Sequence, residues 1–539
     1  MADRTQPRSP GAHAPRAGAP EAYAPEVPRR LDGLVAEAAA LAPDRTALVC
    51  GADRITYGEL DRRVTAAAAL GTLLPGTGAT VAVASVLHPD FAVAYYAAAR
   101  AGHVAAVVNP LLREEDLLHV LTLSGARVAF VDAALYERLA GVRDRLPGLE
   151  QVVLIGDRPY EGLPALRELT ATALGGHAPA ETPAGPDDVA CVQFTSGTTG
   201  RPKAVRLTHR NLTVNADQIA LAHRLDGTSV TVNHLPTFHP MHLNSAVRAA
   251  ATQVLCTGPD PAHAVAAANE HGATHLYSLP VRLARLAADP ALDELGLRTV
   301  TRIASGGSGL PVAAAAQLTE RFGIPVFQGY GLAETSPLTH SDDPDHPVHG
   351  SVGRPVPGTE CRVVDVESRA VLPAGSVGEV QLRGPQVMRG YLGGPDGTGL
   401  EPDGWLTTGD VGRIDDEGRL FLIDRLKDVF KCDNFLVAPS EVELVLGRHP
   451  LVREAVVVDL PDEFSGAVAG ALIVLDPSAT ADGTAEHAVA DVVAFVNDRL
   501  PYYQHIRHAR AVEAVPRSGN GKIQRRALRE QLIGLLAAA

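Results

Sequence analysis

Short valine-rich runs alternate with longer segments of Ala, Leu and Arg from residue 30 to about residue 353, and this alternation limits the fold more than any other feature. The runs have the length of strands, and the segments between them have the composition of helices. Strands that alternate with helices are typical of parallel β-α-β layers. The expected strands near the start of the chain cover residues 80–85, 104–108, 127–131 and 152–155.

The pattern changes after residue 353, where strands separated by Gly, Pro and Asp turns are expected at 361–366, 378–383 and 419–424. A last unit follows, with helices expected at 440–446 and 488–500 and strands at 452–458 and 469–475. The sequence therefore predicts an α/β protein. A large N-terminal domain (29–426) would combine stacked α/β layers with a β-rich subdomain, and a small mobile α+β C-terminal domain (427–539) would follow. The proline-rich residues 1–28 would form a disordered arm.

Bulk composition excludes several classes of partner. A chain of 539 residues exceeds what one hydrophobic core usually organises. The net charge of -14 argues against a nucleic-acid partner, because that binding needs basic surface to displace counterions. Five scattered cysteines without C-x-x-C spacing indicate neither a disulfide framework nor a zinc site. With no secretion signal and no apolar stretch of membrane-spanning length, we expect a cytoplasmic protein without a membrane partner.

Lysine occurs at only four of the 48 Lys and Arg positions. Arg carries a broad planar guanidinium, whereas Lys is a compact charge on a thin stem that can enter a narrow phosphate or carboxylate pocket. All four lysines lie in Gly-rich or charged segments, which favours a chemical role over stray surface positions. They are Lys203, Lys427, Lys431 and Lys522.

The segment that ends at Lys203 is typical of a phosphate-binding loop. It follows an apolar run at 189–194 and consists mainly of glycines and hydroxyl residues. Glycine lets backbone N–H groups close around phosphate oxygens, and hydroxyls add donors. It is not the loop of P-loop enzymes, because Gly197 and Gly200 lie too close together and no Gly directly precedes Lys203. The candidates here are Thr195, Ser196, Gly197, Thr198, Thr199, Gly200 and Lys203.

Two later segments offer an aromatic ring and carboxylates. Residues 328–335 read QGYGLAET after an expected strand at 325–327, and we expect a flexible stretch there. In it, Tyr330 can stack on a base and Glu334 can hold a hard divalent cation through oxygen. Residues 405–410 read WLTTGD, and Asp410 at an expected tight turn can accept both hydroxyls of a ribose.

Six motifs in order carry a resemblance that spans about residues 30–530: TSGTTGRPK, QGYGLAET, GEVQLRG, TTGD, DRLKDVFK and PRSGNGK. With these motifs the chain resembles the adenylate-forming superfamily of acyl-CoA synthetases, nonribosomal-peptide adenylation domains and luciferases. Gln328 before Gly329, together with the segment 424–427, makes it most similar to the coumarate-CoA ligase and luciferase branch.

The resemblance implies ATP and Mg²⁺ as cofactors and gives each matching residue a role. Lys522 would reach the α-phosphate and the acid oxygen as they join, and Lys427 would be the hinge of the small domain. The implied catalytic residues are Lys522, Thr199, Lys203 and Glu334, with Glu334 as the metal ligand. The implied nucleotide contacts are Thr195, Ser196, Gly197, Thr198, Gly200, Gly307, Gln328, Gly329, Tyr330, Gly331, Asp410 and Arg425.

The chain departs from the superfamily pattern in two places. Ala333 replaces a Thr or Ser whose hydroxyl touches the α-phosphate. The acceptor loop after Lys431 carries Asp433 and Asn434, where relatives that use CoA have a basic residue and Gly. Asn434 would narrow the tunnel for the pantetheine arm, and Asp433 would repel the phosphates of CoA. The resemblance thus implies intact adenylation and an altered second half-reaction.

The acid would bind in a pocket framed by His234, His239, His242, Ser305 and Gly306. So many imidazoles suit a small polar or aromatic acid better than a fatty acid. A metal pair at His239 and His242 is disfavoured, because Pro240 interrupts a helix there and no third ligand is evident.

The predicted enzyme is an ATP-dependent ligase that activates a small carboxylic acid as acyl-AMP and transfers it to CoA or another thiol, such as that of a carrier protein. The alternative is a diazotase, which would adenylate nitrite and diazotise an aromatic amine in secondary metabolism. A nucleotide-binding sensor without turnover is disfavoured, because such a protein has no reason to keep Lys522 in a chain where Arg dominates.

Overall fold

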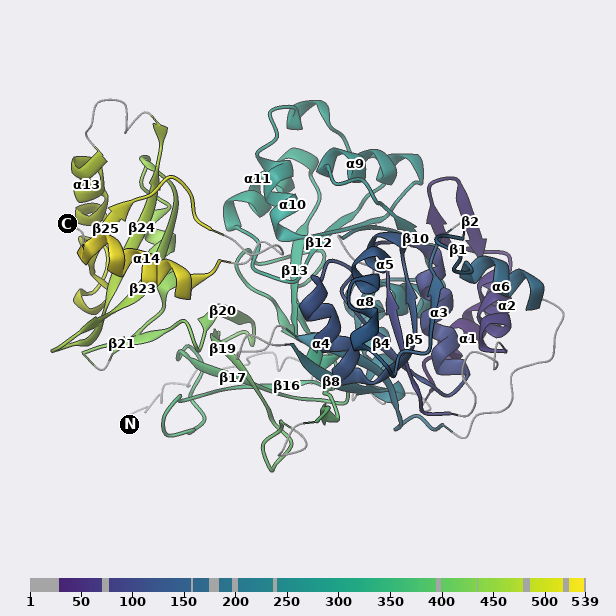
Figure 1. The fold of residues 1–539 in the computed structure, drawn as a ribbon. Helices are drawn as coiled ribbons and strands as arrows, with labels where there is room; N and C mark the ends of the chain where they lie inside the picture. Colours follow the sequence, from purple (N-terminus) through teal and green to yellow (C-terminus); the bar gives the residue numbers. More distant parts are fainter. Residues whose placement is uncertain are drawn as a thin grey trace, which may run out of the picture.

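A computed structural model describes residues 29–69, 77–156, 159–173, 184–195, 202–235, 240–393, 399–433, 435–477, 485–516 and 523–537. The predicted arm at 1–28 lies outside this range. Figure 1 shows a large body that contains the N-terminal and central parts of the chain, with a smaller C-terminal body beside it.

Seven strands of the described chain form one sheet, which is parallel from β7 to β6 and antiparallel at β8 and β18. Its strands in order are β18 (Gly390–Tyr391), β8 (Lys203–Thr208), β7 (Val189–Thr195), β4 (Val104–Val107), β3 (Thr80–Ala84), β5 (Ala126–Val131) and β6 (Gln151–Leu154). The helices of this part are α3 (Pro89–Arg100), α4 (Glu114–Ser124), α5 (Ala133–Ala140) and α6 (Leu166–Ala173), with the short turn η1 (Arg143–Arg145).

A second sheet contains nine of the described strands and is parallel from β13 to β1. Its strands in order are β15 (Arg354–Pro355), β14 (Leu338–Ser341), β13 (Val326–Gly331), β12 (Arg302–Ser305), β11 (His275–Ser278), β9 (Val230–His234), β10 (Thr252–Leu255), β1 (Thr46–Cys50) and β2 (Asp53–Thr56). Its helices are α1 (Gly33–Leu41), α2 (Tyr57–Ala68), α7 (His209–Ala222), α8 (Pro240–Arg248), α9 (Pro261–Glu270), α10 (Pro280–Ala287) and α11 (Val312–Phe322), with η2 (Leu292–Glu294) and η3 (Ala333–Thr335).

Helix α3 shows how the two sheets share one core. Every residue from Pro89 to Ala99 is buried, and the helix contacts β3 and β4 of one sheet and β1 of the other. A helix that is apolar on all sides is stable only when protein surrounds it. The parallel layers predicted from the alternation of strands and helices are therefore confirmed.

The β-rich subdomain is an antiparallel sheet of four described strands: β16 (Glu360–Val364), β17 (Gly378–Arg383), β19 (Leu406–Ile414) and β20 (Leu420–Arg425). Two local predictions were wrong. The segment at 405–410, expected to be a tight turn, runs into strand β19, with a bulge beside Val411 and a left-handed φ of 70° at Gly409. The segment at 328–331, expected to be flexible, continues strand β13.

The small body has its own sheet and its own core. The sheet contains β22 (Phe435–Val437), β21 (Phe430–Cys432), β24 (Gly466–Leu475) and β23 (Val452–Asp462), with β25 (Ile506–Ala511) paired to β24. Helices α12 (Pro439–Leu446), α13 (Ala485–Asn497) and α14 (Arg525–Ala537) and the turn η5 (Tyr502–Gln504) complete it. Its buried apolar cluster runs from Phe430 to Leu532. The predicted large and small domains are thus both present, and Lys427 lies in the turn between β20 and β21.

Candidate functional site

The hairpin of β7 and β8 positions the ends of the predicted phosphate loop. The two strands are antiparallel, and Thr195 pairs with Lys203 at the end where the loop connects them. Helix α7 starts directly after β8 with a capping box, in which the Thr208 hydroxyl accepts from the N–H of Asn211 and the Asn211 amide oxygen accepts from the N–H of Thr208. The loop itself, with Ser196, Gly197, Thr198, Thr199 and Gly200, lies outside the described residues.

Lys203, Tyr391 and Glu334 meet beside this hairpin. The Lys203 ammonium lies 5.0 Å from the centre of the Tyr391 ring, and the Tyr391 hydroxyl donates to Glu334 Oε1 at 2.8 Å. Burial and the Glu334 carboxylate raise the pKa of Tyr391, so the phenol keeps its proton. This arrangement puts a cation and a carboxylate next to the loop where phosphate oxygens are expected.

The sequence analysis missed Tyr391. The residue lies on β18, which pairs antiparallel with β8 so that Tyr391 stands opposite Val205. Strands so far apart in the chain carry no local signal of their pairing. Only the glycine before the tyrosine, at Gly390, hinted at a close backbone approach.

Glu334 offers a carboxylate, which is a type of ligand that Mg²⁺ prefers. It lies in the short turn η3, where the Thr335 hydroxyl accepts from the N–H of Leu332 and the N–H of Met388 donates to the Glu334 carbonyl. Mg²⁺ in nucleotide sites usually takes one or two carboxylates together with phosphate oxygens and water. One partly exposed carboxylate beside Lys203 fits this requirement. The described residues contain no group of three or more His, Cys, Asp or Glu side chains that could hold a metal ion by themselves.

Asp410 joins the large sheet to the β-rich subdomain. It is only 5% exposed, and the Tyr330 hydroxyl donates to its Oδ2 at 2.5 Å. Arg425, opposite Asp410 in the pairing of β19 with β20, places Nε 2.9 Å from Oδ1. Burial raises the pKa of Asp410, while Arg425 and the Tyr330 hydrogen bond oppose that rise. Each carboxylate oxygen keeps a second lone pair, so the group can still accept from a ribose.

Among the predicted contacts, Gln328 and Gly331 also have structural roles. Gln328 Oε1 accepts from the N–H of Leu310 at 2.7 Å, and its Nε2 donates to the Ser351 carbonyl, which fixes the turn that contains Gly307. A Cβ on Gly331 would lie 1.9 Å from the Pro337 carbonyl oxygen, so no other residue fits where β14 approaches β13.

The histidines predicted to share a substrate pocket do not lie together. His234, Ser278, Ser305 and Gln328 occupy one row across the sheet, and Asn233, Tyr277, Ala304 and Phe327 occupy the next. Because successive residues of a strand point to opposite faces, these rows face opposite sides. The ring of His242, on α8, lies 4.5 Å from that of Tyr277 and so belongs to the second face.

His234 is used within the fold. Its Nδ1 bonds the Ser278 hydroxyl at 3.1 Å and its Nε2 bonds the Gly258 carbonyl at 2.9 Å. Burial, as the largest cause, lowers its pKa to about 4. With both ring nitrogens bonded within the protein and its row on the face opposite His242, His234 does not frame a pocket with His242, which corrects the prediction. His239 lies outside the described residues, and Ser305 and Gly306 lie at the carboxyl end of β12.

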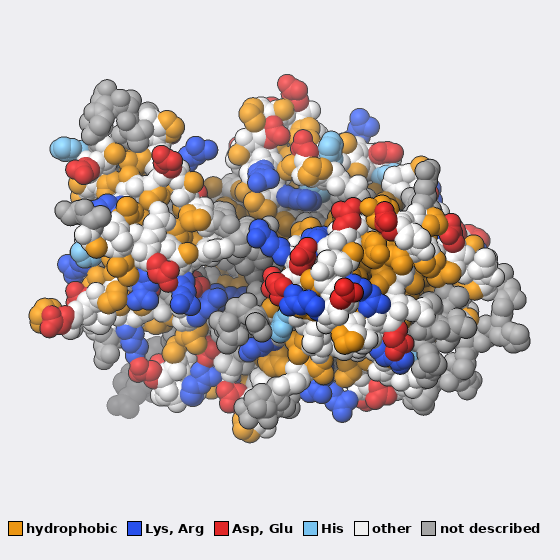
Figure 2. All heavy atoms as spheres, viewed as in Figure 1, with side chains coloured by type: hydrophobic (Ala, Val, Ile, Leu, Met, Phe, Trp, Pro, Cys, Tyr) orange, Lys and Arg blue, Asp and Glu red, His pale blue; other side chains and the backbone are white. Residues whose placement is uncertain are grey.

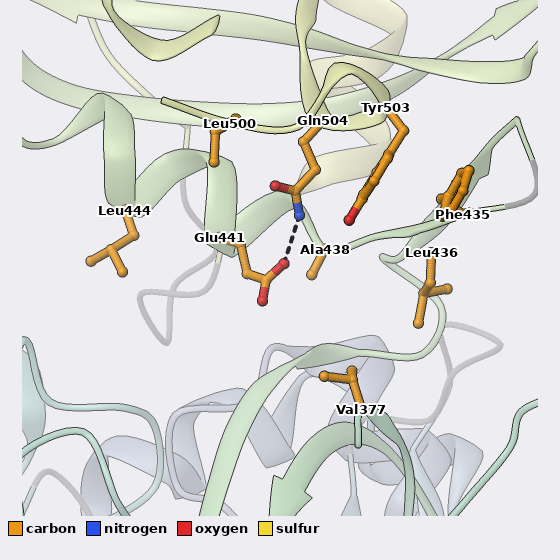
Figure 3. A pocket seen from close by; sticks show the side chains of 9 residues that line it. All are labelled: Val377, Phe435, Leu436, Ala438, Glu441, Leu444, Leu500, Tyr503 and Gln504. Atoms are coloured by element: carbon orange, nitrogen blue, oxygen red, sulfur yellow. Dashed lines mark hydrogen bonds between the residues drawn. The ribbon is translucent and has the colours of Figure 1, made fainter. Parts of the chain in front are cut away.

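The acceptor loop borders a cavity between the small domain and the β-rich subdomain. Phe435 and Leu436 face Val377 across a cavity of about 580 Å³, and Glu441 accepts from Gln504 at 2.8 Å on its inner wall (Figure 3). The Phe435 ring stacks on that of Tyr503 at 4.5 Å. The remaining lining residues are Ala438, Leu444 and Leu500. In this arrangement of the domains, the Phe435 end of the acceptor loop packs on Tyr503 of the small domain.

The other residues of the small domain can be placed in part. Lys427 is exposed in its turn, and Lys431 forms an ion pair with Glu367 of the β-rich subdomain. Asp433 has a left-handed φ of 49°. Asn434 and Lys522 lie outside the described residues. On the face shown in Figure 2, Lys and Arg side chains border the hollow between the small domain and the large one, which suits an anionic substrate.

Comparison with known proteins also indicates an AMP-binding enzyme with a separate C-terminal domain. Residues 35–392 match the family of AMP-binding enzymes, and residues 441–522 match the AMP-binding enzyme C-terminal domain. The chain is 31% identical over 529 residues to 4-coumarate–CoA ligase 2 of Oryza sativa subsp. japonica, which covers 92% of this chain and 91% of the relative.

Two solved structures are similar along almost the whole chain. An anthranilate CoA ligase, AuaEII, in complex with anthranoyl-AMP has a TM-score of 0.84 and 24% identity, over 95% of this chain and 98% of its own. The amide bond synthetase McbA from Marinactinospora thermotolerans has a TM-score of 0.80 and 26% identity, over 93% and 99%. None of the helices that the structure describes is both long and apolar enough to span a bilayer.

Proposed function

The chain belongs to the family of AMP-binding enzymes, an ATP-dependent adenylate-forming ligase by its relatives, and from this premise we propose that it activates a small aromatic or polar carboxylic acid as acyl-AMP. The acyl group then passes to CoA or another thiol. The observation that carries the proposal is the convergence of Tyr330, Asp410 and Arg425 with Lys203, Tyr391 and Glu334 on adjoining elements.

In the first half-reaction a carboxylate oxygen of the acid attacks the α-phosphorus of ATP, and pyrophosphate leaves. Asp410 would accept from the ribose hydroxyls, with Arg425 holding the carboxylate ionised despite its burial. The loop from Thr195 to Lys203 would hold the β- and γ-phosphates. Lys522 would offset the negative charge that develops as the oxygen joins phosphorus. Mg²⁺ held by Glu334 would supply charge neutralisation on the phosphates.

In the second half-reaction a thiol sulfur, having lost its proton to solvent, attacks the acyl carbon. The acyl C–O bond breaks, and AMP leaves with the oxygen that the acid contributed. Rotation of the small domain about Lys427 would bring the acceptor loop to the acid. The exposed turn at Lys427 and the separate core of the small domain support this role. Exclusion of water by the closed domain would protect the mixed anhydride.

The acceptor loop bears on which molecule receives the acyl group. Asp433 and Asn434 replace the basic residue and Gly of the superfamily pattern. The similarity to an amide bond synthetase supports an amine as another acceptor of the same acyl-AMP. Adenylation of nitrite followed by diazotisation of an aryl amine is the second candidate, and the same altered loop favours it, because that reaction needs no pantetheine tunnel.

One screen tests these proposals. Pyrophosphate and AMP release are measured with small aromatic acids, fatty acids, and nitrite plus an aryl amine, each with and without CoA. Acid-dependent pyrophosphate release that needs no CoA, followed by faster AMP release with CoA, is the expected result. Release that depends on nitrite and aryl amine alone would replace the carboxylate proposal with the diazotase. No release in any arm would contradict both.

A further inference from the structure

The two faces of the large sheet differ sharply in polarity. The face covered by α9, α10 and α11 (Figure 1) carries a continuous apolar cluster that includes Val232, Val254 and Leu276. The opposite face, toward the end of α7 and α8, carries polar side chains that are almost completely buried. They are Thr231, Asn233, Gln253, His275 and Tyr277 from the strands and His223 from the end of α7.

Part of this polar layer has no partner among the described residues. Both amide atoms of Asn233, which is 0% exposed, make no hydrogen bond there, and neither does Nε2 of His223, which is 3% exposed. Leaving a buried donor or acceptor unsatisfied is costly, and native proteins rarely do so without a ligand or an ordered water. Both amide atoms of Gln253, which is also 0% exposed, are unpartnered in the described chain as well, so five such atoms within one layer point to something that occupies the space beside them.

Two of the residues with unpartnered atoms, Asn233 and His223, both lie beside Tyr277. Asn233 stands opposite Tyr277 in the pairing of β9 with β11, so the two side chains are neighbours on the same face. The Tyr277 hydroxyl bonds His223 Nδ1 at 3.0 Å, and the His242 ring lies 4.5 Å from the Tyr277 ring. Asn233, His223 and His242 thus surround one phenol.

The layer lies just inside the edge where the acid is expected. Asn233 is the last residue but one of β9, and Ala304, in the same row, immediately precedes Ser305 and Gly306 at the end of β12. Ligands of parallel α/β sheets bind at the carboxyl ends of the strands. An acid whose carboxylate lies at that edge can direct its far end toward Tyr277 and Asn233.

The chemistry of the layer selects a neutral group. An amide offers one donor and one acceptor side, and no Asp, Glu, Lys or Arg contacts Asn233 or Tyr277 by hydrogen bond in the described chain. Burial lowers the pKa of His223 to about 3, so its imidazole is uncharged at neutral pH. Arg302 acts on Tyr277 electrostatically, but it is already paired with Asp345, so a second carboxylate or an ammonium on the acid would have no free counter-charge from it here.

We propose that the acid carries, at the end far from its carboxylate, a neutral substituent with both a donor and an acceptor, such as a phenolic hydroxyl or an aromatic amine, which binds Asn233 and His223. This inference rests on the proposed function and names its substrate class. Asn233 becomes a residue that determines specificity, and Tyr277 positions His223.

The test compares matched acids: cinnamate with its 4-hydroxy, 4-amino and 4-methoxy derivatives, and benzoate with the same set. The measured quantity is kcat/KM for pyrophosphate release. A site built to hydrogen-bond a substrate group discriminates strongly against the analogue that lacks it. We expect at least one hydroxy- or amino-substituted acid to have a kcat/KM roughly tenfold or more above that of its unsubstituted parent. Its kcat/KM should also exceed that of the methoxy-substituted acid, which cannot donate a hydrogen bond.

Asn233→Leu should bring this ratio toward one, because the variant removes the donor and acceptor and fills a similar volume. Gln253→Leu is the matched control. Gln253 is equally buried and also unpartnered in the described chain, but it pairs with Thr231, two residues farther from the strand end, and its replacement should leave the ratio unchanged. Thermal unfolding of both variants shows that they are folded.

The outcomes separate this inference from the function beneath it. Activation of acids with the same ratio in the native protein and Asn233→Leu would overturn the inference alone, and an ordered water would then account for the unpartnered atoms. Activation with a native ratio near one would overturn it as well. No activation of any acid would overturn the proposed function, and the inference with it.

Discussion

Tyr330→Phe isolates the hydrogen bond between the Tyr330 hydroxyl and the buried Asp410 carboxylate. A hydrogen bond to a charged group is worth about 1.5–3 kcal/mol, against about 0.5–1.5 kcal/mol for a neutral pair. Arg425 still pairs with Asp410 in the variant, but its side chain is 48% exposed and solvent screens it. We therefore expect a loss of about 1.5–2 kcal/mol in the unfolding free energy of the large domain at pH 7.5.

The loss should depend on pH in a known direction. Burial raises the pKa of Asp410, and the Tyr330 hydrogen bond opposes this rise, so the variant raises the pKa further. The bond to the charged form contributes stability where Asp410 is ionised, above its pKa in the folded protein. The difference between native protein and variant is therefore full above the Asp410 pKa values of both proteins and shrinks as the pH falls through them.

Tyr96→Phe is the control. Tyr96 is also buried, but its hydroxyl donates to a neutral acceptor, Asn244 Oδ1, at 2.9 Å. Urea unfolding followed by circular dichroism measures both variants over a series of pH values, from slightly alkaline down to the acid limit of the folded state. A loss in Tyr330→Phe that is no larger than in Tyr96→Phe, or that stays constant with pH, would refute the reasoning.

Three further predictions concern catalysis. Lys522→Ala should lower pyrophosphate release by about 10²–10³-fold while ATP binding by calorimetry stays near native, and near-native release would contradict the assigned role. Glu334→Gln should raise the Mg²⁺ concentration needed for half-maximal rate, because it removes the carboxylate charge but keeps the shape; an unchanged Mg²⁺ curve would move the metal site elsewhere. Asn434→Gly should speed thioester formation with CoA and leave acyl-AMP formation unchanged, and native thioester formation that is already as fast would show that Asn434 does not restrict the tunnel.

Local chemistry made much of the fold and part of the site predictable. The strands from 80 to 155 were placed to within a few residues, because a valine-rich run between helical segments has few alternatives. The phosphate loop was placed between β7 and β8 for a similar reason, since glycines and hydroxyls after an apolar run indicate a loop wherever they occur. The turn expected at Asp410 proved to be strand β19, because pairing with β17 and β20 overrides the local preference of Gly409.

The errors and omissions arise where distant segments meet. Tyr391 reaches Glu334 only because β18 pairs with β8, and no local pattern specifies that pairing. His234 and His242 were expected to frame one acid pocket, yet a strand directs successive side chains to opposite faces and α8 covers only one of them.

The sequence by itself thus determined the α/β architecture, the order of the segments that carry chemistry and the family to which the chain belongs, because each of these is written in short stretches of residues. Only the tertiary structure decided which side chains share a space. It placed Asn233 and His223 beside the buried Tyr277 side chain, and it bonded the His234 ring to the Gly258 carbonyl. The physical reason is that contacts between strands and helices depend on register and face, which are fixed when the layers pack.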